Sequence, residues 1–428
     1  MITATRNYFR FLWRCARIAF IGDWRYVSWM GFLTVIVLLG LNAYCKQVVH
    51  GLITTGMSDQ VSWGVYISNF TFIVGIAAAA AMLVIPVYIY DNEELHDLVI
   101  FGELLAVAAI LMCLAFVTVD LGRPDRFWHL IPGIGKFNFP HSMLAWDVIV
   151  LNGYLLLNVY ICGYLLYCRY SGRKPAKWFY IPFVFIAIVW AVSIHTVTAF
   201  LYVGLGGRHF WNSAIVGPRF LASAFTAGPA LIILALQVIR RVTSYRITDK
   251  ALLTLRGIVQ VSMIINVFLL LNEVFKEFYS KSKNITSSTY LFFGLEGHHA
   301  LVPWIWTAVT FNLIAMFLLV LPLTKSLKYL NFACVLAIVG IWIEKGMGLV
   351  VPGFIPTPLG EIVEYSPSLN ETLISLSIWA FGFLAYTVFL RMSVPILQGK
   401  LSRSTENIPL QEVIFPSETK PAKTTATC

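Results

Sequence analysis

Charged residues are scarce in this 428-residue chain, where they make up only 12% of the sequence. Soluble globular proteins carry about 25% charged residues, whereas 58% of the residues here are hydrophobic. This composition excludes a water-soluble enzyme of this length, and it also excludes disordered, collagenous and disulfide-rich secreted chains. The sequence therefore predicts a polytopic membrane protein.

Clusters of metal ligands are also lacking. The seven cysteines form no C-x-x-C or other pattern with iron–sulfur or zinc spacing. Of the eight histidines, only His195 lies well inside an apolar run, whereas a haem buried in a bundle needs ligands on facing helices. The sequence predicts no metal site, haem or iron–sulfur cluster in this chain, although a haem close to the outer surface stays open.

Ten apolar runs are long enough to cross the hydrocarbon core of a bilayer. They show no period-2 alternation, so membrane-spanning helices are predicted and barrel strands are not. The predicted fold class is an all-α polytopic membrane protein with ten transmembrane helices. These runs centre on residues 27–49, 65–90, 98–119, 143–168, 179–204, 220–239, 251–275, 301–323, 329–343 and 371–390.

The distribution of lysine and arginine predicts the orientation. With the N-terminus inside, the inner segments hold 20 basic residues and the outer segments hold 9. The positive-inside rule then places both termini in the cytoplasm. Topology accounts for the net charge of +10, so no nucleic-acid partner is expected.

The two ends of the chain differ from its centre. In residues 1–25, arginines recur at helical spacing among aromatic residues, which predicts a cytoplasmic amphipathic helix on the inner membrane surface. Residues 26–397 form the predicted transmembrane domain. Residues 398–428 are polar and predict a disordered cytoplasmic tail.

Polar and ionisable residues inside the apolar runs are costly and by default mark a site or pathway. Apart from Glu103, almost all of them fall in the outer third of the predicted membrane. A solute carrier tends to have its site at the midplane, whereas an outer site suits an amphiphile such as a quinone. Structural interpretations remain open: Asp120 could pair with Arg123, and His195 could be a core histidine. The outer set includes Tyr66, Asn69, Asp120, Asp147, His195, Glu273 and Glu344.

Three motifs resemble one protein family. Residues 63–72 (WGVYISNFTF), residues 120–127 (DLGRPDRF) and residues 342–346 (WIEKG), followed by PGFIP at 352–356, are similar to segments of the NrfD/PsrC-type membrane subunits. The resemblance runs from about residue 24 to residue 390. Within the family, the chain is most similar to the DsrP-type subunit of DsrMKJOP complexes, with HmcC-type subunits as close relatives.

The resemblance implies two four-helix bundles, formed by helices 2–5 and 6–9 and flanked by helices 1 and 10. It also implies a prokaryotic cytoplasmic (inner) membrane subunit without a redox cofactor of its own. Such subunits exchange electrons between menaquinone or menaquinol and a periplasmic-side, ferredoxin-like iron–sulfur subunit. In a Dsr-type complex, a multihaem cytochrome and further membrane and cytoplasmic subunits would be partners.

Residue roles follow from the resemblance and from predicted depth. Tyr66 and Asn69 match by position polar residues that line the quinone pocket of the family. Asp147 and His195 are placed in the same pocket from their predicted depth in the membrane. A secondary transporter and a cytochrome b-like haem subunit remain the alternatives. The predicted roles are proton exchange with the quinone for Asp120, Asp147 and His195; quinone binding for Tyr66, Asn69, Trp146 and Tyr202; a proton pathway for Glu103, Glu273 and Glu344; and partner docking for Arg123, Arg126, Trp128 and His129.

Overall fold

The computed structural model describes residues 2–280, 285–406 and 408–414. Within these ranges the regular structure is helical, apart from isolated bridges in two loops. Ten helical segments are long and apolar enough to cross a membrane, which confirms the predicted all-α fold and the multi-pass membrane protein.

The predicted spans agree with the observed helices to within about five residues, except that spans nine and ten extend further at their C-terminal ends. Span two consists of two helices, and span nine continues from α13 through α14 (Met347–Val350) and η4 (Val351–Phe354). The spanning helices are α2 (Trp24–His50), α3 (Val65–Ala78) with α4 (Ala81–Tyr88), α6 (Val99–Asp120), α7 (Met143–Tyr170), α8 (Lys177–Val203), α9 (Val216–Val242), α10 (Asp249–Ser280), α12 (Val302–Val320), α13 (Leu327–Lys345) and α15 (Leu369–Leu397).

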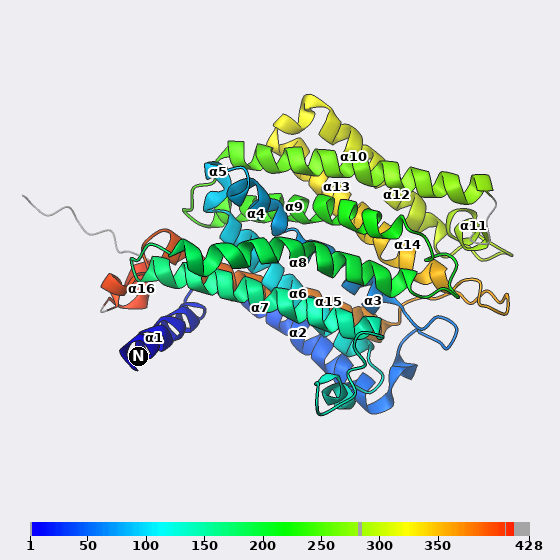
Figure 1. Cartoon of the computed structure of the whole chain (residues 1–428), viewed down its shortest axis with the longest axis horizontal. Helices are drawn as coiled ribbons and strands as arrows, with labels where there is room; N and C mark the ends of the chain where they lie inside the picture. Colours follow the sequence, from blue (N-terminus) through cyan, green and yellow to red (C-terminus); the bar gives the residue numbers. More distant parts are fainter. Residues whose placement is uncertain (1, 281–284, 407, 415–428) are drawn as a thin grey trace, which may run out of the picture.

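The spans pack as two bundles with a flanking pair (Figure 1). Helices α3, α4, α6, α7 and α8 form the first bundle, and α9, α10, α12 and α13 form the second. Helix α2 packs along α15 beside the first bundle. This is the arrangement that the family resemblance implies.

A seam of small residues joins the two bundles where α3 packs against α9. A methyl group added at Gly228 would overlap the Cβ of Ala79, and one added at Gly75 would lie 3.6 Å from the Cβ of Ala224. Small side chains let helix backbones approach closely inside a membrane. The seam therefore brings α13 of the second bundle within reach of polar side chains on α3.

Short elements connect the spans. At the end of the spans where α1 (Ile2–Ile18) lies, they are α5 (Glu93–His96) and η3 (Pro322–Lys325). On the opposite end, they are η1 (Leu52–Thr54), η2 (Pro124–Leu130) and α11 (Ile285–Phe293). The end that carries α1 is the predicted inner side, and its orientation in the cell stays a prediction.

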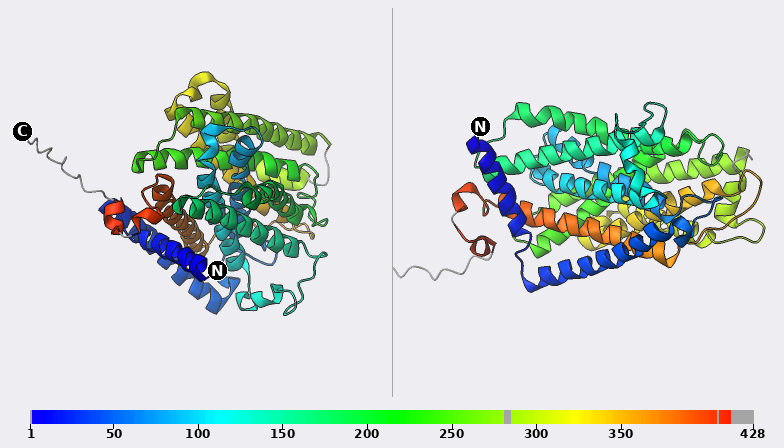
Figure 2. Two further views of the ribbon diagram at one scale, coloured as in Figure 1. Left: turned by 60° about the vertical axis from the view of Figure 1, so that its left-hand side comes forward. Right: turned by 90° about the horizontal axis from the view of Figure 1, so that it is seen from below.

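Helix α1 (Ile2–Ile18) crosses the inner ends of the spans instead of running parallel to them (Figure 2, right). It contacts α7 and α15. In the segment that follows α15, η5 (Arg403–Thr405) and α16 (Leu410–Ile414) are helical, and Arg14 donates a 2.8 Å hydrogen bond to the carbonyl of Thr405. Residues 415–428 of the predicted tail lie outside the described residues.

Candidate functional site

Buried polar groups on α7 and α8 face the interior of the first bundle in its outer half. Asp147 and His195 are fully or almost fully buried. The hydroxyl of Thr198 lies 3.2 Å from Asp147 Oδ1 and 2.8 Å from the carbonyl of Ile194, and it can donate to one at a time. Neither ring nitrogen of His195 has a partner among the described residues. Because buried polar atoms normally have partners, this face has capacity for water or a ligand.

The imidazole of His195 faces α3. Its Nε2 would lie 3.7 Å from a Cβ added at Gly75, which is ordinary van der Waals contact, so the ring packs against the backbone of α3 at that glycine. Tyr202, two turns further along α8, is also fully buried, and its hydroxyl hydrogen-bonds with that of Thr71 on α3. The rings of Trp63 and Trp211 pack against Tyr202.

Tyr66 and Asn69 on α3 face other neighbours. The Tyr66 hydroxyl donates to Gln47 Oε1 on α2 at 2.7 Å. Asn69 Oδ1 accepts hydrogen bonds of 3.0 Å from the indole N–H groups of Trp342 on α13 and Trp379 on α15. The residues predicted for one pocket are therefore distributed around α3, because sequence gives depth and face but not the neighbour on each side.

Trp146 lies at the outer rim of the first bundle. Its side chain is half-buried, and its indole N–H donates to the carbonyl of Pro140 at 2.9 Å. Its ring also packs against Phe139, with ring centroids 4.6 Å apart. Trp146 therefore packs against the loop that leads into α7, and Asp147 follows it inside the bundle.

Asp120 is the last residue of α6, and its Oδ1 is buried without a partner among the described residues. Among the described residues Asp120 does not pair with Arg123, which was the structural interpretation that the sequence left open. Arg123 instead forms two 3.0 Å hydrogen bonds with Asp125, and this contact lowers the pKa of Asp125. The chain becomes extended at Leu121, so Arg123 is directed into solvent.

The four predicted docking residues all lie on or next to η2. Each is exposed, and the rings of Trp128 and His129 lie 4.0 Å apart. Basic and aromatic side chains on one exposed turn are typical of protein–protein contact sites. The structure therefore leaves these residues available: Arg123, Arg126, Trp128 and His129.

Glu103 is buried in the inner half of α6, away from the other predicted acids. The thiol of Cys162 on α7 donates to Glu103 Oε2 at 3.1 Å. A thiol is a weak donor, so this contact compensates little of the cost of burying a charged carboxylate. Glu103 belongs to the first bundle, whereas Glu273 and Glu344 belong to the second.

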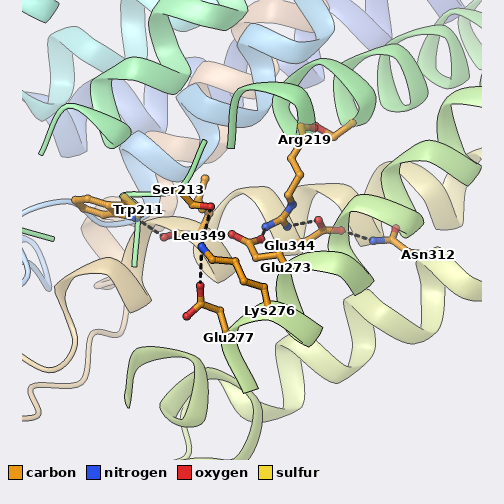
Figure 3. Close-up of polar contacts among 10 residues, drawn as sticks. Trp211, Ser213, Arg219, Glu273, Lys276, Glu277, Asn312, Glu344 and Leu349 are labelled. Atoms are coloured by element: carbon orange, nitrogen blue, oxygen red, sulfur yellow. Dashed lines mark hydrogen bonds and ion pairs between the residues drawn. The ribbon is translucent and has the colours of Figure 1, made fainter. Parts of the chain in front are cut away.

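The second bundle contains an ion cluster that consists of Arg219, Glu273, Asn312 and Glu344 (Figure 3). Arg219 forms ion pairs with Glu273 and, at 2.6 Å, with Glu344. Asn312 Nδ2 donates to the other oxygen of Glu344 at 2.6 Å. Each of α9, α10, α12 and α13 contributes one of these residues, so the ion cluster joins all four helices.

Arg219 and Lys345 are among the 9 basic residues that the predicted topology places in the outer segments, so the sequence gives Arg219 no role in a site. The structure places it in the first turn of α9, with a side chain that is 13% exposed. A signal was present, since two carboxylates predicted inside the membrane require a counter-charge. Lys345, also counted outside, is buried too and donates to the carbonyl of Phe220 at 2.9 Å.

Two further features border the ion cluster. A cavity beside it is lined by the charged residues Arg219, Glu273 and Glu344 and by apolar residues that include Leu270 and Phe292. Lys276 lies outside this arrangement, with its Nζ 3.4 Å from Glu277 Oε1 and 3.4 Å from Ser213 Oγ (Figure 3).

Polar side chains continue from the ion cluster toward the inner end of the second bundle. Asn266 is fully buried, and neither atom of its amide group has a partner among the described residues. It precedes Glu273 by two helical turns, on the same face and about 10 Å deeper. Nearer the inner end, the amides of Gln237 and Asn331 hydrogen-bond with each other.

Comparison with known proteins identifies the family. The family model described as polysulphide reductase, NrfD, matches residues 53–355. This stretch includes both bundles and the ion cluster. The chain belongs to the NrfD family. Within the described ranges, no three His, Cys, Asp or Glu residues come together as metal ligands, and the predicted absence of a metal site stays a prediction.

Two of the curated relatives are similar along most of their length, and a third is similar over about a third of its length. A Halobacterium salinarum protein named as a membrane subunit of a dimethyl sulfoxide reductase is 26% identical over 76% of this chain and 77% of its own length. The Hdr-like menaquinol oxidoreductase integral membrane subunit of Archaeoglobus fulgidus is 23% identical over 86% of this chain and 93% of its own. The menaquinone reductase integral membrane subunit of Nitratidesulfovibrio vulgaris is 24% identical over 32% of this chain and 31% of its own.

Proposed function

We propose that this chain is the quinone-exchanging membrane subunit of a respiratory redox complex, with its quinone site in the outer half of the first bundle. The observation that carries the proposal is the pair of buried acid–base groups there. Asp147 has one weak hydroxyl partner, and His195 has none among the described residues. Two relatives in this family bear the names of menaquinol and menaquinone enzymes.

Proton exchange is the chemistry that these side chains would provide. Oxidation of a quinol to a quinone releases two electrons and two protons, so each quinone oxygen needs a group that accepts or returns a proton. A carboxylate and an imidazole suit this role because both ionise within an accessible pH range. We assign proton exchange to Asp147, His195 and Asp120, and contacts with the head group to Tyr66, Asn69, Trp146 and Tyr202. Tyr66 and Asn69 would have to exchange their present hydrogen bonds with Gln47 and with the two tryptophans for contacts with the quinone.

The electrons would leave through a partner on the outer face. We propose that an iron–sulfur subunit docks against η2, where Arg123, Arg126, Trp128 and His129 are exposed. This exposed turn follows directly from the outer end of α6, where Asp120 lies. A subunit docked there would therefore lie close to the proposed quinone site, as electron tunnelling requires.

A proton pathway through the membrane is a separate part of the proposal. Glu273 and Glu344 at the outer end, Asn266 in the middle and the Gln237–Asn331 pair further in give a series of polar groups through the second bundle. Waters bound to the unpartnered amide of Asn266 would connect them. Glu103 would have the corresponding role in the first bundle.

The finer assignment remains the DsrP type of NrfD subunit, in a complex linked to sulfur metabolism. The proposal places the chain in a prokaryotic cytoplasmic membrane, with both termini inside. Its partners would then include a periplasmic iron–sulfur subunit, a multihaem cytochrome and further membrane and cytoplasmic subunits. The support for this assignment is the likeness of the three sequence motifs.

The test is purification of the intact complex from native membranes in mild detergent, through a tag at the C-terminus. We expect iron–sulfur and haem subunits to co-purify, and their redox spectrum to change when a menaquinol analogue is added. The Asp147→Asn complex should keep its subunits but lose this response. A chain that purifies without redox partners and transports solute alone would instead indicate a transporter, and a Soret band from the isolated chain would indicate a cytochrome.

A further inference from the structure

Helix α1 presents three distinct faces along its length. One face packs against the protein, a second is apolar and exposed, and a third is basic and exposed. Phe9 is 65% exposed and Trp13 is 66% exposed, although both are large hydrophobic residues. The packed face carries Phe11, Cys15 and Ile18; the apolar face carries Phe9, Leu12, Trp13 and Ala16; the basic face carries Arg6, Arg10 and Arg17.

The packed face holds α1 in a defined orientation. The ring of Phe11 lies 5.1 Å from that of Tyr170 on α7, and Arg14 donates to the carbonyl of Thr405. Just after α1, Arg391 of α15 donates two hydrogen bonds of 2.9 and 2.7 Å to the carbonyl of Ile21. Because these contacts prevent rotation of α1, its apolar and basic faces point in directions that the fold sets.

Helix α1 lies at the end of the spans that the sequence predicts to face the cytoplasm. It crosses the ends of the spans at the point where the chain enters α2 (Figure 2). Exposed aromatic residues occur at the same end of the spans, with Trp24 in the first turn of α2 and Trp178 in the first turn of α8. Exposed tryptophans at span ends are typical of the membrane–water interface.

We propose that the basic face of α1 binds the headgroups of anionic phospholipids in the leaflet at this end of the spans, while its apolar face enters the acyl region. Charge complementarity identifies this occupant, since no acidic residue precedes Asp23 in the sequence. In helices that lie in the membrane interface, arginines typically contact lipid headgroups while an adjacent apolar face is buried in the membrane. The inference does not depend on the quinone site.

The binding has a consequence for the C-terminal segment. Helix α1 contacts that segment through the bond from Arg14 to Thr405, and Tyr170 of α7 donates to Glu406 at 3.0 Å. An anionic leaflet that stabilises α1 would therefore also stabilise residues 400–406. The composition of the leaflet would thus affect order on the inner face of the whole subunit.

Hydrogen exchange of the full-length protein in lipid nanodiscs tests the proposal. We compare discs of phosphatidylcholine with discs that contain about 30% phosphatidylglycerol. Each basic residue near an anionic surface contributes about fivefold to binding, so amides of residues 5–18 should exchange about 10- to 100-fold more slowly in the anionic discs. The difference should shrink when salt is raised to about 0.5 M, because surface charges are then screened.

Two triple variants separate the arginines of α1 from basic charge in general. Arg6→Gln/Arg10→Gln/Arg17→Gln should abolish the effect of anionic lipid. Arg173→Gln/Lys174→Gln/Lys177→Gln, which removes two exposed basic residues from the loop between α7 and α8 and a third from the start of α8, should keep it. Equal exchange in both kinds of disc overturns the proposal, as does equal loss in the two variants. Protection of α1 only after a protein partner is added also overturns it, in favour of a protein interface.

Discussion

The two bundles use ionisable residues in opposite ways. In the first bundle, three ionisable residues are buried singly on different helices. Glu103 contacts a thiol and Asp147 contacts a hydroxyl. His195 has no hydrogen-bond partner among the described residues. In the second bundle, the carboxylates of Glu273 and Glu344 share the guanidinium of Arg219. In the described part of the chain, the acid–base groups of the first bundle therefore lack counter-charges, whereas the carboxylates of the second bundle are neutralised by an arginine.

This difference bears on what each bundle can do. A buried charge without a partner is costly, so a neutral form that can exchange a proton is favoured at such a position. A paired cluster instead stabilises the packing of the helices that supply it, and breaking one member leaves an uncompensated charge. We therefore expect variants of the first bundle to lose activity and variants of the second to lose stability.

The largest effect is expected at His195. His195→Gln keeps a polar side chain of similar size but removes the acid–base group, so quinol-dependent electron transfer by the intact complex should fall about 10²- to 10⁴-fold. The thermal midpoint should change little, because the imidazole has no hydrogen-bond partner to lose among the described residues. Steady-state quinol oxidation and a melting curve on the same sample measure both.

A polar residue on the lipid side of the same bundle provides the control. Asn152 on α7 is exposed, and its amide donates to the carbonyl of Val148 one turn earlier. Asn152→Ala should leave turnover unchanged. If His195→Gln turns over normally, His195 has no part in proton exchange and the pocket assignment fails.

The second largest effect is expected at Arg219. Arg219→Gln leaves two buried carboxylates without a counter-charge, which should destabilise the second bundle by about 3–5 kcal/mol. Adding Glu273→Gln should restore part of this loss, because one of the two orphaned charges is removed. Denaturation of the purified protein in detergent gives the comparison, with exposed Arg126→Gln as the control. Full stability in Arg219→Gln would mean that the carboxylates are already protonated in the native protein.

Much of the fold could be predicted from the sequence because long apolar runs have few alternatives in a bilayer. The spans and their number follow from that constraint. What could not be predicted is the direction in which a buried polar side chain points. Tyr66 and Asn69 lie less than one turn apart on α3, yet their partners are Gln47 on α2 and two tryptophans on α13 and α15.

The ion cluster shows the second limit of the sequence. The sequence identifies Glu273 and Glu344 as ionisable groups within spans, but it places their shared partner Arg219 in an outer segment. Apolar periodicity locates a helix only to within a few residues, and Arg219 lies in the first turn of α9. Whether the side chain of a residue at such a boundary is exposed or buried depends on partners that are distant in sequence, as Glu273 and Glu344 are from Arg219.

A third prediction tests the packing that supports the ion cluster. A methyl group added at Gly340 on α13 would overlap Asn312 Oδ1. Gly340→Ala should therefore displace the Asn312 amide from Glu344 and destabilise the protein by about 1–3 kcal/mol. Gly257→Ala on α10, where nothing lies within 4 Å of the added methyl, should be neutral or slightly stabilising. Equal stability of the two variants would show that Asn312 can shift without loss.

The smallest effect is expected in the outer loops, where Glu364 connects the 355–368 loop to the start of α12. Burial alone would raise the pKa of Glu364. Three contacts oppose this effect: a 2.9 Å hydrogen bond from the Ala300 N–H, a 3.4 Å contact with His298 Nδ1 and a 3.4 Å hydrogen bond from the Tyr290 hydroxyl. Together they outweigh burial, so the pKa of Glu364 is lowered. A lowered folded-state pKa gives a stabilisation that is complete above the usual Glu pKa of about 4.3. That stabilisation is lost as the pH falls through the lower value.

Glu364→Gln should therefore reduce the thermal midpoint at pH 7, by the equivalent of less than about 1 kcal/mol because the pair is partly exposed. The difference from the wild type should shrink as the pH falls below about 4, where the wild-type carboxylate also becomes neutral. Melting curves across this range measure it, with the exposed neighbour Glu361→Gln as the control. A difference that is constant with pH would assign the contribution of Glu364 to packing. The charge of Glu364 would then contribute nothing to stability. The difference between paired and unpaired charges would in that case apply only within the two bundles.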